Sequence, residues 1–268
     1  MSEHGSEVSA GKRFEFGKNW QRYLSILDET KMATARESLR RMLDVENLEG
    51  KCFLDIGSGS GLFSLSARSL GATVYSFDYD PLSVACTREL KARFFPEDDQ
   101  WTITEGSVLE EQFMEQLGQF DVVYSWGVLH HTGEMWRAID IAARRVREGA
   151  YFFIMIYLDT GLRSAIWWWI KRLYCSSVVG KALVLSLFLP YYLVRGFVED
   201  VIRLKSPFRR YKERQKARGM SAFRDWFDWL GGFPYEYAKP EEVEEFCQQR
   251  NLTLLKREGP EYVFRKTE

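Results

Sequence analysis

The sequence predicts an α/β fold built on a doubly wound, Rossmann-like sheet of seven strands. From residue 48 to about residue 157, short apolar runs alternate with segments of helical periodicity, the pattern of a sheet with helices on both faces. A glycine-rich turn joins the first apolar run to the first helix of that series, as in nucleotide-binding α/β domains. Two last apolar runs, residues 252–256 and 262–265, flank a Gly-Pro turn and predict a final antiparallel hairpin.

Composition indicates a globular chain with an α/β domain and an insertion. The 268 residues are 46% hydrophobic and 28% charged, which is enough apolar material for one large core. The net charge of -1 does not favour nucleic acid as a partner. The four cysteines have neither metal-ligand nor disulfide spacing, and we expect no metal. The first twelve residues are polar and lack the apolar core of a signal peptide, so we expect a cytoplasmic protein.

The glycine turn has a spacing that excludes two common nucleotide motifs. Gly57, Gly59 and Gly61 stand at alternate positions, and Leu62 occupies the place of the last glycine of G-x-G-x-x-G. No Lys-Ser or Lys-Thr pair follows, so the turn is not a P-loop. Asp55 lies just before the turn, where a carboxylate would repel a pyrophosphate. The turn therefore favours a ligand that carries positive charge.

These residues resemble motif I of the class I S-adenosylmethionine-dependent methyltransferases, whose cofactor carries an ammonium and a sulfonium but no phosphate. The resemblance covers about residues 48–157 and 235–266, with several motifs in order, and is strongest to the ubiquinone-biosynthesis O-methyltransferases. It implies S-adenosylmethionine as the cofactor, in the seven-stranded sheet of that family. The positions expected to bind it are Asp55, Gly57, Ser58, Gly59, Gly61, Asp78, Tyr79, Ser107, Val108, Ser125, Trp126 and Trp20.

The second strand, residues 72–77, ends at an acidic residue. Asp78 lies 21 positions after Gly57 (78 − 57), about where an acidic side chain binds the ribose hydroxyls in dinucleotide-binding folds. Tyr79 is suited to stack on an adenine ring. Asp80 and Pro81 form a helix start, with aspartate as N-cap and proline in the first turn. Asp80 therefore has a structural role available, whereas Asp78 is interpreted as a ligand.

The third and fourth strands, residues 101–104 and 120–125, lead to further expected contacts. Ser107 and Val108 follow the third strand, where the family usually has Gly-Asp-Ala, so Ser107 departs from the usual aspartate. Ser125 and Trp126 end the fourth strand. These positions belong to the carboxyl edge of the sheet, where open α/β sheets bind their ligands.

The two adjacent histidines, His130 and His131, follow the fourth strand at a position where the family commonly has a histidine. The chain contains only three histidines. One of the pair is a candidate general base for a hydroxyl acceptor. The alternative is a structural role, and both interpretations stay open here.

The N-terminal region, residues 1–47, is expected to be a tail followed by a helix from about residue 20 to residue 48. Residues 1–11 are rich in Ser, Glu and Gly, and we expect them to be disordered. Aromatic residues up to Trp20 sit beside basic ones. The helix is either a lid over the cofactor or an ordinary amphipathic helix.

The methyltransferase-like domain is expected to comprise residues 48–158 and 235–268. The insertion between them, residues 159–234, is expected to form a helical cap that binds the acceptor. Its purest apolar run, between Lys181 and Pro190, is shorter than the ~20 residues of a membrane span. Pro190 is expected to end or kink the helix there. The cap either covers the sheet edge alone or also rests on a membrane, with the basic residues of 195–218 meeting anionic lipid.

An aromatic stretch, residues 223–236, closes the cap. It is either a substrate wall or a hydrophobic seam. The expected acceptor contacts are Trp226, Trp229, Tyr235 and, at the end of the fifth strand, Tyr157.

Taken together, the residues predict methyl transfer to a hydroxyl of an apolar or aromatic small molecule, with a histidine as base. N-methylation of a small molecule is the near alternative, since an amine needs no base. A non-catalytic domain that binds S-adenosylmethionine is an alternative from another class. RNA methylation is disfavoured by the net charge and by the absence of an Asn-Pro-Pro-aromatic motif after the fourth strand.

Overall fold

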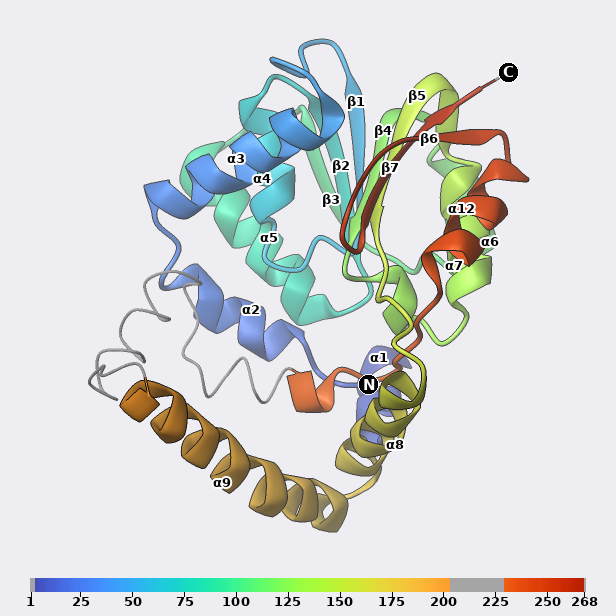
Figure 1. Ribbon diagram of the computed structural model, residues 1–268. Helices are drawn as coiled ribbons and strands as arrows, with labels where there is room; N and C mark the ends of the chain where they lie inside the picture. The colour runs from blue at the N-terminus through green and yellow to red at the C-terminus, as the bar shows by residue number, and fades with distance from the viewer. Residues whose placement is uncertain (1–2, 203–228, 268) are drawn as a thin grey trace.

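A seven-stranded mixed sheet forms the centre of the molecule (Figure 1). The computed structural model describes residues 3–202 and 229–267. The strand order is β3-β2-β1-β4-β5-β7-β6, so the predicted doubly wound α/β fold is confirmed. The strands are β1 (Cys52–Ile56), β2 (Thr73–Asp78), β3 (Trp101–Glu105), β4 (Phe120–Trp126), β5 (Val146–Met155), β6 (Leu252–Glu258) and β7 (Glu261–Lys266).

Strands β1 to β5 are parallel, and β7 runs antiparallel between β5 and β6. Phe152 of β5 lies opposite Phe264 of β7, and both are fully buried. The final hairpin therefore enters the sheet with its second strand inside and its first strand at the edge.

Two helical layers cover the sheet (Figure 1). Alternation along β1 sends Phe53 to one face and Leu54 to the other, where each joins a separate core. The first face is covered by α3 (Glu29–Leu43), α4 (Leu62–Ser69) and α5 (Pro81–Phe94). The second is covered by α6 (Glu111–Gln116), α7 (Met135–Ala143) and α12 (Pro240–Gln248).

The N-terminal region differs from the expectation in two ways. Residues 3–9, expected to be disordered, form the helix α1 (Glu3–Ser9), and its His4 is buried. The single helix expected over residues 20–48 is two helices, α2 (Gly17–Leu24) and α3. Asp28 separates them, because its side chain accepts a hydrogen bond from the Lys31 amide (2.9 Å) and begins α3 as an N-cap.

Helices α8 (Leu162–Ser176) and α9 (Val178–Ile202) follow β5 and pack on each other beyond the carboxyl ends of the strands (Figure 1). Tyr174, Val184 and Leu230 form a small core between them and the following chain. Pro190 was expected to end or kink the helix, but α9 continues through it to Ile202. As a result α9 is long and apolar enough to cross a membrane, and only 11% of its most apolar 18-residue window is buried.

Candidate functional site

The glycine loop between β1 and α4 has a backbone that only glycine adopts easily. Gly57 and Gly61 have φ of 77° and 81°, values that are costly for residues with a Cβ. A Cβ on Gly57 would lie 2.5 Å from the Val128 side chain, and one on Gly61 would lie 2.9 Å from the backbone of Thr87. The loop is thus held between α5 and the turn that follows β4. Ser58 is also held against α5, by a 2.9 Å hydrogen bond between its hydroxyl and that of Thr87.

Asp78 lies directly beside this loop. Its Oδ2 accepts a hydrogen bond from the Gly59 amide (2.8 Å), and its Oδ1 accepts one from the Asp80 amide (2.9 Å). Burial raises the pKa of Asp78 to about 6, against these two amides, which lower it. The Tyr79 amide also interacts with this carboxylate. A carboxylate has about four acceptor sites, so capacity remains for a ligand hydroxyl.

Asp55, by contrast, is engaged inside the protein. Its carboxylate accepts a hydrogen bond from the Ser64 hydroxyl, which also pairs with Ser76 (2.7 Å), and Ser76 in turn accepts from the Trp101 indole (2.9 Å). Burial raises the pKa of Asp55 to about 7. This side chain therefore holds α4 against β1 and β2. Its direct contact with the cofactor stays a prediction.

The N-terminal segment covers the glycine loop and the end of β2. The Trp20 ring lies 3.1 Å from where a Cβ of Gly59 would stand. Gly17 donates a backbone hydrogen bond to Asp80 (2.8 Å). Tyr79 packs between the His4 ring and the Arg13 guanidinium, which lies 5.0 Å from the Tyr79 ring centre. The predicted lid therefore touches residues that were predicted to bind the cofactor.

The remaining predicted cofactor residues differ in their surroundings. The Ser107 hydroxyl accepts from the Leu109 amide (3.2 Å), within the turn after β3, and Val108 is buried in the core. Ser125 donates to the Ile56 carbonyl (3.1 Å) and so ties the end of β4 to the end of β1. Trp126 is 42% exposed and donates to Glu261 of β7 (2.8 Å).

His130 and His131 lie in the short helix η1 (Leu129–His131) that follows β4. Burial lowers the pKa of both, that of His131 to about 3, so both imidazoles are neutral near pH 7. Nδ1 of His131 is 2.5 Å from the Pro234 carbonyl oxygen. Since a carbonyl only accepts, Nδ1 carries the hydrogen and Nε2 has a free lone pair.

Three of the four predicted acceptor residues gather around this pair. The Tyr157 ring centre lies 3.9 Å from that of His130, 5.5 Å from that of Tyr235 and 6.1 Å from that of Trp229. Trp226, the fourth, lies outside the described residues.

Lys171 of α8 belongs to the same cluster and was not predicted. It is 1% exposed, its Nζ donates to the Trp229 carbonyl, and it lies 4.4 Å from the Trp229 ring centre and 5.0 Å from that of Tyr235. Burial lowers the pKa of Lys171 to about 7. The one available signal in the sequence was a lysine in the middle of an aromatic helical run, residues 166–174.

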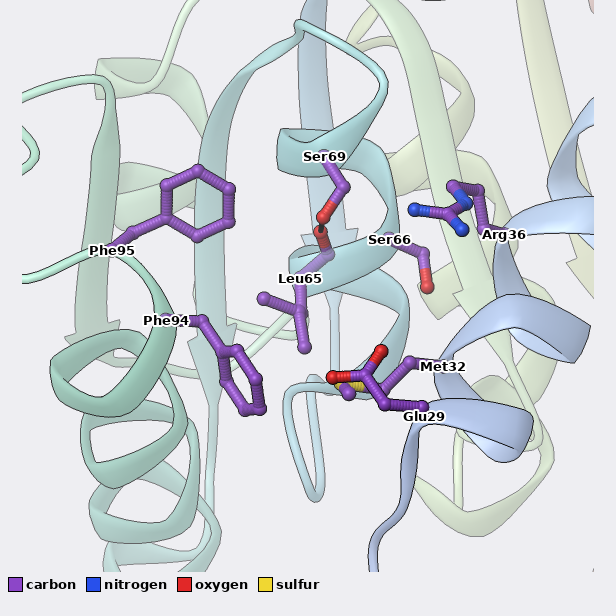
Figure 2. Close-up of a pocket in the computed structure, with 8 residues that line it drawn as sticks. All are labelled: Glu29, Met32, Arg36, Leu65, Ser66, Ser69, Phe94 and Phe95. Atoms are coloured by element: carbon purple, nitrogen blue, oxygen red, sulfur yellow. Dashed lines mark hydrogen bonds between the residues drawn. The ribbon is translucent and has the colours of Figure 1, made fainter.

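A surface cleft lies elsewhere, between α3, α4 and the end of α5 (Figure 2). Met32, Arg36, Leu65 and Phe94 are among its lining residues, and none of the predicted site residues is. Within residues 3–202 and 229–267, no cluster of three His, Cys, Asp or Glu side chains is arranged to hold a metal ion.

Comparison with known proteins decides the family. The methyltransferase domain family matches residues 27–183, more than half of the chain. The chain belongs to this family. The expected class I S-adenosylmethionine-dependent methyltransferase is thereby confirmed. The family match includes β1 to β5, the glycine loop, both histidines and α8.

Two curated relatives are ubiquinone biosynthesis O-methyltransferases. That of Pseudomonas paraeruginosa is 30% identical over 143 residues, covering 52% of this chain and 54% of the relative. That of Escherichia coli is 32% identical over 108 residues, covering 40% and 42%. The chain thus spans about half the length of the curated relatives it matches.

Solved structures share the fold of this methyltransferase domain. A magnesium protoporphyrin IX methyltransferase from Synechocystis, with bound S-adenosylhomocysteine, is 12% identical with a TM-score of 0.53, covering 92% of this chain and 93% of that one. An O-methyltransferase family protein from Burkholderia thailandensis is 14% identical with a TM-score of 0.51, covering 81% and 51%. At such identity the likeness establishes the fold alone.

Proposed function

We propose that this protein transfers the methyl group of S-adenosylmethionine to a hydroxyl of an apolar or aromatic small molecule. The observation that carries the proposal is the juxtaposition of His130 and His131 with the aromatic side chains of Tyr157, Trp229 and Tyr235. This cluster follows β4 and β5, and β4 is the strand next to the one that carries the glycine loop.

The residues at the glycine loop fit the cofactor. S-adenosylmethionine supplies a methyl group on a positively charged sulfur and carries no phosphate. Gly57, Gly59 and Gly61 would let its chain lie against the backbone, and Asp78 would accept hydrogen bonds from the ribose hydroxyls. Trp20 and Tyr79 would close over the bound cofactor from the N-terminal segment.

The acceptor would lie against the aromatic cluster. Flat aromatic and apolar surfaces favour a ring or an alkyl chain over a charged molecule. Catalysis of methyl transfer depends mainly on holding the hydroxyl oxygen in line with the methyl group. A hydroxyl also has to lose its proton as the new bond forms.

His131 is the proposed base, through its Nε2. Burial and the nearby charges of Lys171 and Arg13 oppose a positive imidazolium and hold the pKa of His131 at about 3, so a proton taken up there has to leave again at once. Lys171 is a second acceptor for that proton, since its amine lies in the same cluster and its pKa of about 7 suits proton transfer at neutral pH.

Replacement of Asp78 tests the cofactor site. Calorimetric titration with S-adenosylmethionine and S-adenosylhomocysteine should show micromolar binding to the wild type and a loss of roughly tenfold or more in Asp78→Ala, about the value of a charge-assisted hydrogen bond. Asp99→Ala is the control, because Asp99 is an exposed aspartate after α5. Equal affinity in both variants would remove Asp78 from the site.

Replacement of the histidines tests the chemistry. Transfer of a labelled methyl group should be measured with phenols and catechols that carry apolar tails, and with matching amines. His130→Ala/His131→Ala should lower the rate by roughly 10²–10⁴ if one histidine is the base. A loss below about threefold, with cofactor affinity intact, would pass the role to Lys171, which Lys171→Met then tests. Cofactor binding without product from any acceptor would favour the non-catalytic alternative, and transfer to amines alone would favour N-methylation.

A further inference from the structure

Helix α9 presents a continuous apolar stripe to the outside of the molecule. Its members recur every three or four residues, which places them on one side of an α-helix. They are between 46% and 77% exposed, and they are Val179, Leu183, Leu187, Tyr191, Val194 and Val198. The side that packs against α8 carries Gly180 and Val184, which are buried. A soluble protein rarely leaves a stripe of this length in water.

The stripe is long and without charge. From Ala182 to Val194, thirteen residues (194 − 182 + 1), α9 contains no Asp, Glu, Lys or Arg. From Val179 to Val198 the stripe runs about 29 Å at the α-helical rise. Lys181 and Arg195 mark the two ends of the uncharged part, and both are exposed.

The neighbouring helix adds to this surface. Leu162, Ile166, Trp169 and Leu173 of α8 follow the same three-or-four spacing and are all exposed. Arg172 lies over the rings of Trp168 and Trp169, at 5.0 and 5.5 Å from their centres. Tryptophan and arginine together are typical of the boundary between lipid headgroups and acyl chains.

The topology decides how such a helix meets a bilayer. β7 pairs with β5 in one sheet, and α8, α9 and the return to α12 lie between them in the chain. A single crossing by α9 would place α12, β6 and β7 on the other side of the membrane from β5. A helix that meets the bilayer within this fold would therefore lie along its surface, although its length and composition would also suffice for a span.

We propose that α9 docks this protein on an anionic lipid bilayer, with its apolar stripe in the headgroup region and its buried side toward α8. The sequence immediately after α9 supports anionic lipid as the partner, because residues 203–218 contain eight Lys and Arg against one Glu. This inference deepens the proposed function by naming the surface from which an apolar acceptor reaches the cap.

In Figure 1, α8 and α9 lie beyond the carboxyl ends of the strands. Lys171 of α8 contacts Trp229 and Tyr235, so the histidine and aromatic cluster adjoins α8. A docked α9 thus turns the acceptor side of the protein toward the lipid. An acceptor dissolved in the bilayer would enter without crossing bulk water.

Flotation with lipid vesicles tests the inference without cofactor or acceptor, so its failure is separate from that of the methyl-transfer proposal. The wild type should float with vesicles of phosphatidylcholine mixed with phosphatidylglycerol, and less with phosphatidylcholine alone. Leu187→Glu/Val194→Glu should lower the bound fraction at least tenfold, because both carboxylates would enter the apolar layer. Leu255→Glu is the matched control, since Leu255 is 52% exposed on the sheet edge strand β6.

The wild type and both variants should have the same circular dichroism and cofactor affinity, which shows that they are folded. A wild type that stays unbound with both vesicle types would overturn the inference. So would a double variant that floats like the wild type. A wild-type dimer that the double variant turns into a monomer, with no flotation, would assign the stripe to a second copy of the chain instead.

Discussion

At the scale of single residues, the site is defined by ionisable groups that burial has moved away from their usual pKa. Asp55 and Asp78 have raised pKa values, Lys171 and His131 have lowered ones, and desolvation is the largest cause for all four. Burial of a charge costs stability unless a partner compensates it. Such groups cluster at functional sites because catalysis and binding make use of them.

Lys171 should make the stability of the protein depend on pH. Its pKa is about 7 in the folded protein, against the ordinary lysine value of 10.5 in the unfolded chain. Between these values the unfolded chain binds more protons, so the free energy of unfolding rises with pH. Lys171→Met should remove this rise. Urea titrations at several pH values between about 7 and 10 would measure it.

The control for this measurement is Lys51→Met, a change at an exposed lysine before β1. It should leave the pH dependence as in the wild type. Parallel curves for the wild type and Lys171→Met would contradict the burial of a neutral amine at this position.

Residue identities were predictable from the sequence where a motif fixed them. Asp78 was predicted from its place at the end of the second strand, and the structure puts it beside Gly59. Lys171 could not be predicted, because its burial depends on Trp229 and Tyr235, which are about 60 residues away in the chain (229 − 171 = 58). The contact of Asp55 with Ser64 depends in the same way on how α4 packs against β1.

At the scale of elements, the glycine loop sets the distance between the sheet and the turn after β4. Gly57→Ala should lower the free energy of unfolding for two reasons. Its φ of 77° is unfavourable for alanine, and the added Cβ clashes with Val128. Gly149→Ala is a matched control, since Gly149 has φ of 72° and nothing within 4 Å of an added Cβ.

The difference between the two variants therefore isolates the clash, and it should be roughly 1–3 kcal/mol, the usual range for overpacking a core. Denaturant unfolding would measure it, and Gly57→Ala should also weaken cofactor binding. Equal losses in both variants would mean that Val128 moves away freely.

Elements with strong local signals were predictable. Asp80 and Pro81 begin α5 as expected, with the Asp80 side chain accepting from the Leu82 amide (2.9 Å). The helices before the sheet were not predictable, because α1 packs through contacts with residues far along the chain. Examples are the contacts of His4 with Asp80 and Tyr79. A polar composition alone indicated disorder there, and tertiary contacts outweigh it.

At the scale of the whole molecule, the sheet and helix α9 differ in how much of their surface is covered. Val123 of β4 and Ile154 of β5 are completely buried, whereas most of α9 faces outward. The seven-stranded sheet was predictable from its alternating pattern. The length and exposure of α9 were not predictable, because Pro190 was expected to end or kink the helix, whereas α9 continues to Ile202.

Amides of α9 should therefore exchange with solvent at a lower free energy of opening than those of β4 and β5, since few buried contacts hold the helix. Hydrogen exchange followed by mass spectrometry would measure this for the protein in solution. Addition of anionic vesicles should slow the exchange of α9 and leave that of the strands unchanged. Protection of α9 equal to that of β5 without lipid would contradict the expectation.

The place of β7 in the sheet also sets the order in which the protein can assemble during synthesis. β7 fills the position between β5 and β6, yet it is made after both of them and after the cap. Until residues 261–266 have left the ribosome, the edge of β5 stays open and its backbone groups are free to pair with another chain. The apolar helix α9 has by then already emerged. A nascent chain that reaches a membrane early would shelter this helix before the sheet is complete.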